Sequence, residues 1–392
     1  AIKPDLIDAH HKIGNALKKL GRLDEALASY EREVALNPNS VAEHNNLGTT
    51  LQNLGRLDEA LASYDRALAG DPDISIVHSN KGSLLLERGR LDEALASYER
   101  ALASNPDSSI TDYHLGILLQ KLGRPEDALV SFERALASDL NSPESLDCLY
   151  ALGRYDDFYK RLEESIEADG TNIGIAALSG YVSNQLDREN PHPFCKNPLD
   201  CIRVGKIGYS VGDIEELSNS LVEELLQVKT NWEPYKVTTI SGYQTPGNIF
   251  ANPQGSLAKL DRIIKSEIQS YHSEYKSMKC SFMDFWPGEI RLSGWFVRLL
   301  GGGHQRAHIH RSGWLSGVVY LKLPEAPIGD DGCIEFSLNG YDHPLLNDDY
   351  PRTMHRPQKG QIVLFPSSLF HRTVPIKADE ERMCVSFDLH PA

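Results

Sequence analysis

A ten-residue string that recurs at a fixed spacing constrains the fold of this chain more than any other feature. GRLDEALASY occurs three times and a close variant, GRPEDALVSF, once, with successive copies 34 residues apart. The four copies begin at Gly21, Gly55, Gly89 and Gly123. A shortened copy, GRYDDF, begins at Gly153. Self-similarity at a period of about 20–50 residues indicates a stack of short units that bury a core only against their neighbours.

The residues that recur inside each unit predict two packed helices. A glycine in the first helix lets the second approach closely, and an alanine in the second helix is followed one turn later by an aromatic side chain on the same face. These sets are Gly14, Gly48, Gly82 and Gly116; Ala26, Ala60, Ala94 and Ala128; Tyr30, Tyr64, Tyr98 and Phe132. A proline then ends the second helix in three units, at Pro38, Pro72 and Pro106.

Two positions depart from this pattern. Glu33 stands where the later units have alanine, and Leu140 replaces the fourth terminating proline. The alanines are Ala67, Ala101 and Ala135.

With this period and these positions, the segment resembles the tetratricopeptide repeat family, with about four full repeats and a shortened fifth. The resemblance implies an α-solenoid whose first helices line a concave groove, and a role in binding protein or peptide or in self-association. In register, one groove-facing column would include Lys12, Asn46, Asn80 and His114. Asparagine side chains can hydrogen-bond the backbone of an extended peptide. The alternative is that these are solvent-facing positions of no consequence.

Composition sets limits on the whole chain. With 392 residues, 41% hydrophobic and 24% charged, the chain is long enough for two or three soluble globular domains. No apolar run is long enough for a membrane span, and the first residues have no signal-peptide core. The six cysteines are scattered and form no CxxC pair, which favours a reducing compartment, the cytoplasm, and disfavours thiolate metal sites.

The negative charge is concentrated in the repeats. Residues 1–175 contain 18 Lys and Arg against 30 Asp and Glu, whereas residues 176–392 contain 22 against 25. We therefore expect no nucleic-acid binding by the repeats, and mildly favour a neutral or basic partner. A solvated acidic helical surface is the alternative explanation.

The sequence changes character after the repeats. NQLDRENPHPFCKNPLD has three prolines and no periodicity, so we predict a repeat domain at 1–175, a linker at 176–200 and a second domain at 201–392. Helical apolar stripes follow in DIEELSNSLVEELLQV and GSLAKLDRIIKSEIQSYHSEY. We expect these two helices to support a sheet.

Strand-like runs dominate the last hundred residues and surround three histidines. The runs are GWFVRLL, SGVVYLKLP, GCIEFSL, GQIVLFP and RMCVSFDL, and they predict a β-sandwich or barrel. His308 and His310 share a face if the chain there is extended, and His371 follows the fourth run. Three converging imidazoles would suit a borderline divalent metal. For each histidine alone, a structural role is the alternative.

The closing run adds a cation. Strand alternation places Arg382, Cys384 and Ser386 on one face. If that face is the interior, the guanidinium needs an anionic partner, and its planar donors beside a hydroxyl suit a carboxylate. An arginine at an exposed strand end is the alternative.

Together these residues resemble 2-oxoglutarate- and Fe(II)-dependent dioxygenases of the double-stranded β-helix (jelly-roll, cupin-like) fold. The nearest resemblance is to an oxygenase branch with an HxH, then SGVxYL, GxxxxFPSxxxH and a closing RxxxSF. These stand here as His308-Ile-His310, SGVVYL from Ser316, GQIVLFPSSLFH from Gly360 and RMCVSF from Arg382.

The resemblance implies roles for individual residues. His308 and His371 would be metal ligands, and His310 takes the place usually held by Asp or Glu. Arg382, helped by Ser386 and Tyr320, would bind the distal carboxylate of 2-oxoglutarate. The metal would be Fe(II), with 2-oxoglutarate and O2 as cosubstrates of a hydroxylation.

The imidazole in place of a carboxylate raises the charge of such a site by one. It leaves three alternatives open: ligation by only two histidines, a three-histidine oxygenase that binds its substrate without 2-oxoglutarate, and an inactive site. Arg382 favours 2-oxoglutarate over the second of these.

We expect a hydroxylase whose repeats present a protein or peptide to the iron site, because tethering raises the effective concentration of a substrate. One alternative is a small-molecule hydroxylase whose repeats serve assembly. Another is a catalytically inactive protein-binding scaffold. We expect no nucleic-acid or membrane partner, and the oligomeric state stays open.

Overall fold

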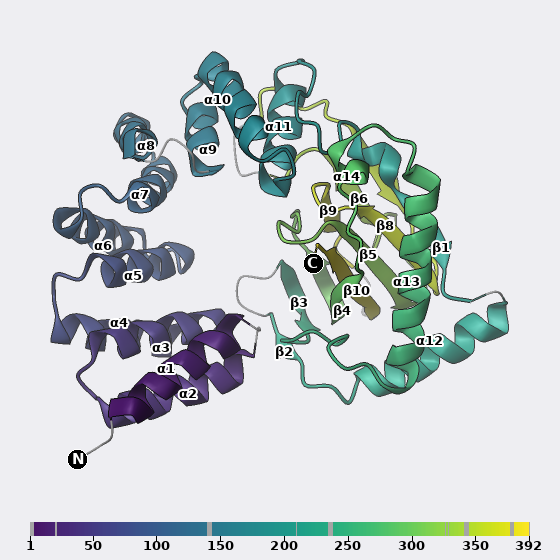
Figure 1. Cartoon of the computed structure of the whole chain (residues 1–392), viewed down its shortest axis with the longest axis horizontal. Coiled ribbons are helices and arrows are strands. Elements are labelled where there is room, and N and C mark those ends of the chain that lie inside the picture. Colours follow the sequence, from purple (N-terminus) through teal and green to yellow (C-terminus); the bar gives the residue numbers. More distant parts are fainter. Residues whose placement is uncertain are drawn as a thin grey trace. The chain divides into compact units, whose positions relative to one another are not determined.

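The computed structural model consists of two compact units, which divide between Phe158 and Tyr159. Figure 1 shows helices throughout the first unit, and sheets with supporting helices in the second. The residues that the structure describes are 4–19, 22–138, 143–208, 210–233, 238–325, 327, 329–340, 345–376 and 380–391.

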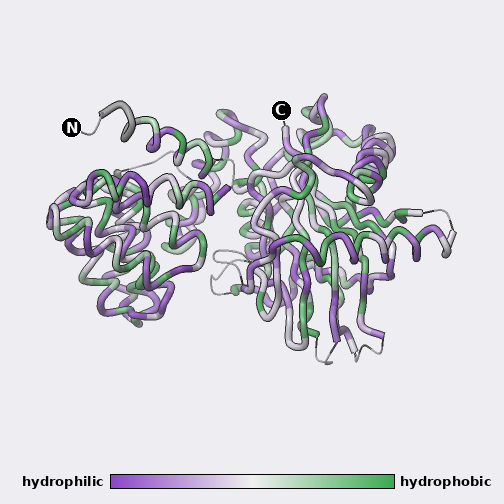
Figure 2. The backbone as a smooth tube through the Cα atoms, turned by 90° about the horizontal axis from the view of Figure 1, so that it is seen from below, coloured by the Kyte–Doolittle hydropathy of each residue, from purple (hydrophilic) through white to green (hydrophobic). Residues whose placement is uncertain are grey.

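The first unit is built from helix pairs, and each full pair is one 34-residue repeat. The helices are α1 (Pro4–Lys19), α2 (Leu23–Leu36), α3 (Val41–Asn53), α4 (Leu57–Gly70), α5 (Ser75–Glu87), α6 (Leu91–Ser104), α7 (Ser109–Lys121), α8 (Pro125–Ser138), α9 (Pro143–Ala151) and the start of α10 (Tyr155–Ala168), which continues into the second unit. Hydrophilic and hydrophobic residues alternate along these helices, as expected where one face is buried (Figure 2). The α-helical repeat fold predicted from the sequence is confirmed.

The recurrent glycines allow the close approach that the pattern predicts. A Cβ atom added to Gly48 would lie 2.6 Å from the ring of Tyr64, and one added to Gly82 would lie 2.8 Å from Tyr98. Both rings are fully buried. A methyl group does not fit at such distances, so these glycines set the spacing between the two helices of a pair.

A buried aspartate replaces a recurrent histidine in the fourth repeat. His44 Nε2 lies 2.8 Å from the carbonyl oxygen of Pro38, and His78 Nε2 lies 2.7 Å from that of Pro72. The residue 34 positions further on is Asp112, which is fully buried and whose carboxylate oxygens accept no hydrogen bond from the described residues. A carboxylate cannot donate to a carbonyl as an imidazole can. Burial raises the pKa of Asp112 to about 6, although Arg134 nearby opposes the shift.

We expect Asp112→Asn to raise the free energy of unfolding by about 1–3 kcal/mol at pH 7, because the raised pKa of Asp112 makes its ionisation unfavourable in the folded state. The sign follows from the folded-state pKa lying above the unfolded-state value of about 4. The penalty is absent below pH 4, grows between pH 4 and 6, and is constant above. Urea unfolding at pH 3.5 and pH 7 measures it. Asp107→Asn, at an exposed position, should leave the free energy of unfolding unchanged at both pH values. An equal gain in stability of Asp112→Asn at pH 3.5 and at pH 7 would contradict the prediction.

Two antiparallel sheets form the centre of the second unit. The larger sheet has the order β1 (Arg203–Lys206), β8 (Gln361–Pro366), β5 (Leu315–Lys322), β10 (Arg382–His390), β4 (Arg291–Gln305), β3 (Thr239–Gln244), β2 (Asn231–Trp232). The smaller has the order β7 (Arg352–His355), β6 (Ile334–Ser337), β9 (Phe370–Thr373). The predicted β-sheet domain is confirmed, whereas its assignment as a double-stranded β-helix stays a prediction.

The alternation along β10 separates two cores. Val385, Phe387 and Leu389 belong to a core shared with the supporting helices, whereas Cys384 belongs to a core shared with Phe336 of the smaller sheet. Arg382, two residues before Cys384, and Ser386, two after it, lie on the same face of β10 as Cys384. The predicted face of β10 therefore points into the space between the sheets.

The predicted supporting helices are present as α12 (Val211–Leu225) and α13 (Gly255–Tyr275), and their apolar stripes pack in the core with Val385. A short helix, α14 (Ser281–Asp284), packs there through Phe282. The division at 1–175, 176–200 and 201–392 stays a prediction. Residues 176–200 include most of α11 (Ile173–Gln185) and the fully buried Phe194. None of the helices described here has the length and apolar character that crossing a bilayer requires.

Candidate metal centre

Backbone pairing brings the two histidine segments together. His308 N–H donates to the carbonyl of His371 at 3.1 Å, and His371 N–H donates back to that of His308 at 3.1 Å. His310 N–H donates to the carbonyl of Ser367 at 3.1 Å. The segment between β4 and β5 is thus fastened to the segment from β8 into β9, and the spacing of two residues puts His308 and His310 on the same side.

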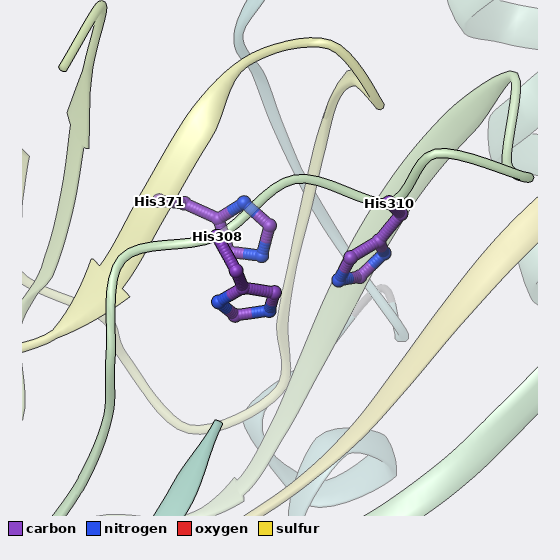
Figure 3. Close-up of side chains that lie close together, drawn as sticks. All are labelled: His308, His310 and His371. Carbon is purple, nitrogen blue, oxygen red and sulfur yellow. The ribbon is translucent and has the colours of Figure 1, made fainter. Parts of the chain in front are cut away.

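The three imidazoles face one point, as Figure 3 shows. Ring centroids lie 4.2 Å apart for His308 and His371, 5.0 Å for His308 and His310, and 4.9 Å for His310 and His371. Each ring offers one nitrogen, and these nitrogens all lie within 4.8 Å of one another. His310, which replaces the usual carboxylate, points to the same place as the other two.

Hydrogen bonds at the outer nitrogens fix the orientation of the rings. His308 Nδ1 lies 2.7 Å from the carbonyl oxygen of Arg306, and His371 Nδ1 lies 3.2 Å from that of Leu369. Because a carbonyl only accepts, each Nδ1 carries the proton and each Nε2 has a free lone pair. An outer nitrogen held in this way is typical of histidines that bind metals.

His310 has a carboxylate as its outer partner. Its Nδ1 lies 2.6 Å from Asp388 Oδ1, and only 7% of the Asp388 side chain is exposed. Ser316 Oγ donates to the same carboxylate oxygen at 2.7 Å and lies 2.8 Å from Ser367 Oγ. His310 stands where a carboxylate ligand would usually face the metal. The negative charge is instead supplied by Asp388, which is hydrogen-bonded to the opposite side of the His310 ring.

Burial keeps the rings of His308 and His371 neutral. Burial, with His310 close by, lowers the pKa of His308 to about 3. Burial, together with His308 and His310, lowers the pKa of His371 well below its usual value. Neutral imidazole is the form that binds a metal ion.

Arg382 lies at the wall of the same cavity. The cavity is lined by the three histidines, Arg382, Ser386 and Trp295, among others. Arg382 is 1% exposed, and its Nε has no hydrogen-bond partner among the described residues. The guanidinium carbon lies 4.9 Å from the ring centre of Tyr320, whose buried hydroxyl likewise makes no hydrogen bond of normal geometry there. Tyr320 thus lies beneath Arg382 and does not line the cavity beside the histidines.

The candidate groove residues lie in the first unit; Asn46, Asn80 and His114 are half-buried, and Lys12 is exposed. Asn80 Nδ2 donates to Asn45 Oδ1 at 3.0 Å, so one of its amide hydrogens is already used between two repeats. His114 stacks on Tyr98, with ring centres 6.3 Å apart. Asn46 lies one residue after Asn45 on α3.

The structure adds residues that the sequence argument overlooked. Asp388 continues the alternation of Arg382 and Ser386 by one further step along β10. The two-residue alternation of the strand could therefore have indicated Asp388 from the sequence alone. No comparable signal marks Ser316 and Ser367, which meet only through the pairing of β5 with β8.

Family models match both parts of the chain. Models described as "Tetratricopeptide repeat" match residues 11–73, 45–109 and 85–147. A model described as "Putative 2OG-Fe(II) oxygenase" matches residues 293–388, which include the three histidines, Arg382 and Asp388. No curated protein matches the chain.

Several solved structures match part of this chain. PilF of Pseudomonas aeruginosa is 23% identical, with 47% of this chain and 85% of that chain covered and a TM-score of 0.40. A thermophilic repeat protein of Thermus thermophilus, TTC0263, is 23% identical, with 43% and 94% covered and a TM-score of 0.38. YrrB, described as having an unusual peptide-binding site, is 19% identical, with 42% and 88% covered and a TM-score of 0.33. The chain thus joins tetratricopeptide repeats in its N-terminal part to a region, residues 293–388, that matches the 2OG-Fe(II) oxygenase family.

Proposed function

We propose that this protein is a 2-oxoglutarate- and Fe(II)-dependent dioxygenase that hydroxylates a protein or peptide substrate recruited by its repeats. One observation supports the proposal above all. Three imidazoles, of which those of His308 and His371 are neutral with free Nε2 atoms, share a cavity with a buried arginine whose Nε has no partner among the described residues. A metal chelated by a small dianion would satisfy both groups at once.

The donor set fits Fe(II). Imidazole nitrogens suit borderline divalent ions, and three ligands on one side leave positions open for other molecules. His308, His310 and His371 would hold the metal through Nε2. When bound, the metal with 2-oxoglutarate would supply O2 activation: one oxygen atom enters succinate as CO2 is lost, and the other enters the substrate as a hydroxyl group.

Arg382 would select the cosubstrate. A buried guanidinium costs free energy unless an anion pairs with it, and its forked donors match a carboxylate. Ser386 lines the same cavity, and its hydroxyl would donate a hydrogen bond to that carboxylate. The packing of Tyr320 against the guanidinium would hold it in the binding orientation.

Asp388 would fix the third ligand. Its carboxylate accepts the Nδ1–H of His310, orients the ring and strengthens the donor character of Nε2. The same hydrogen bond would offset part of the positive charge gained by having imidazole in place of the usual carboxylate.

We expect Asp388→Asn to weaken Fe(II) or Co(II) affinity by about 10–100-fold, because the neutral amide is a poorer partner for His310. Anaerobic metal titration of the full chain measures this. Asp261→Asn replaces a carboxylate that is also buried but that pairs with Lys265 on α13, away from the site, and should leave the affinity unchanged. Wild-type metal affinity in Asp388→Asn would contradict the proposed role of Asp388 in orienting His310.

The role of the repeats rests on the groove column of Asn46, Asn80 and His114. Their half-buried polar side chains would contact the backbone of an extended segment. An acidic surface on this unit would favour basic or neutral segments. We also propose a cytoplasmic location, in keeping with six cysteines that form no disulfide.

Succinate release tests the function directly. The full chain with Fe(II), 2-oxoglutarate and O2 should form succinate when peptides from a cell lysate are added, and mass spectrometry should find one added oxygen on a peptide. Arg382→Ala should form none. Succinate that rises with small-molecule extracts but not with peptides would favour a small-molecule substrate, and an absence of succinate with both would favour a binding scaffold.

A further inference from the structure

The first repeat buries a carboxylate where the other repeats bury a methyl group. Glu33 on α2 occupies the position held by alanine in the next three units. Those alanines are at most 5% exposed, and Glu33 is 0% exposed. The fold therefore accepts a small apolar residue here, and an acid needs a separate explanation.

Two further donor side chains meet Glu33 from neighbouring helices. His11 on α1, Glu33 and Glu43 on α3 each offer one ligand atom, and these atoms lie within 4.8 Å of one another. His11 Nδ1 lies 3.7 Å from Glu33 Oε1, beyond hydrogen-bonding distance. Glu43 is 9% exposed, and its Oε2 is shielded from solvent with no hydrogen-bond partner in the described part of the chain.

The repeat register shows that these three positions form a recurrent contact. One unit later they are Asn45, Ala67 and Val77, and two units later Ser79, Ala101 and Thr111. Ser79 Oγ lies 3.1 Å from Thr111 Oγ1. A contact filled in the next two units by neutral side chains is filled in the first repeat by an imidazole and two carboxylates.

This chemistry points to a cation. Two carboxylates that share a buried site repel each other, and a cation between them would relieve that repulsion and pair with Glu43 Oε2. One imidazole nitrogen with two carboxylate oxygens is a ligand set for zinc and similar divalent ions. We propose that His11, Glu33 and Glu43 bind a divalent transition metal ion, separate from the oxygenase site, which ties α1 to α2 and α3.

Such an ion would act on the structure and not on the reaction. It would fasten α1 to the next helix pair and so stiffen the first repeat, which carries Lys12 of the groove column. The proposal does not depend on the function of the second unit, because all three ligands lie in the first.

Zinc stoichiometry and local hydrogen exchange test the site in the full chain. In equilibrium dialysis, Glu33→Ala should bind one zinc ion fewer than the wild type, and Glu33→Ala in a His371→Ala background should bind one fewer than His371→Ala. Zinc should also slow amide exchange in the peptide covering α1 in the wild type and in His371→Ala, but not in Glu33→Ala.

The repeats supply matched variants. Glu33→Ala, Glu43→Val and His11→Asn each introduce the residue that the next unit has at the same position, so the fold should be kept, and circular dichroism checks this. His10→Ala, at the adjacent residue, should retain the ion. The proposal is wrong if the Glu33 and Glu43 variants bind as much zinc as the wild type, or if zinc protects α1 equally in them.

Discussion

Replacing Arg382 with methionine is expected to weaken 2-oxoglutarate binding strongly and, at the same time, to make the ligand-free protein more stable. The guanidinium is 1% exposed and its Nε has no partner among the described residues, so the protein without a bound anion bears the cost of a buried charge. Methionine fills much of the same volume without that cost. We expect a gain of about 1–4 kcal/mol in unfolding free energy and a loss of affinity of about 100-fold or more.

Calorimetric titration with 2-oxoglutarate and urea unfolding without it measure the two effects. Arg352→Met, at an exposed position on β7, should change neither. Weaker 2-oxoglutarate binding together with higher stability distinguishes a binding role of Arg382 from a packing role, because substitution of a residue that only packs would lower the stability of the protein. Wild-type 2-oxoglutarate affinity in Arg382→Met would contradict the proposed role of Arg382.

The second large effect concerns the three histidines. Alanine at His308, His310 or His371 should each weaken Fe(II) or Co(II) binding by more than about 100-fold, since loss of an outer partner alone costs about 10–100-fold. Anaerobic titration measures the affinities. His304→Ala is the matched control, because His304 lies close in sequence but outside the cluster of candidate ligands found in the described residues.

Substitution of His310 distinguishes metal ligation by three histidines from ligation by two. Wild-type affinity in His310→Ala would mean ligation by two histidines only. His310→Asp restores the usual carboxylate but places it against Asp388, so the two negative charges should repel each other. We therefore expect His310→Asp to bind metal weakly, and the double variant with Asp388→Asn to bind more tightly than His310→Asp alone.

The repeats were predictable in detail because their information is local and periodic. A spacing of 34 residues fixes which glycine faces which aromatic ring, and Gly48 does lie against Tyr64. The same register marked Glu33 as a departure. It did not reveal that His11 and Glu43 meet Glu33, because that contact joins three helices and depends on how successive pairs pack.

The candidate site was predictable only in part. Strand alternation placed Arg382 and Ser386 on one face, and one more step would have reached Asp388. The contact between Asp388 and Ser316 depends on the pairing of β10 with β5, which joins segments about seventy residues apart, and no local pattern specifies such a pairing. Tyr320 was placed in the cofactor set by resemblance, whereas the structure puts its ring beneath Arg382.

The most direct test of the account is the visible spectrum of the anaerobic full chain with Fe(II) and 2-oxoglutarate. If the three histidines hold the metal while Arg382 holds the distal carboxylate, a weak charge-transfer band should appear with both components present. It should disappear in His371→Ala and in Arg382→Met and persist in His304→Ala. A wild-type protein that gives no band, or a band unchanged in Arg382→Met, would contradict the account.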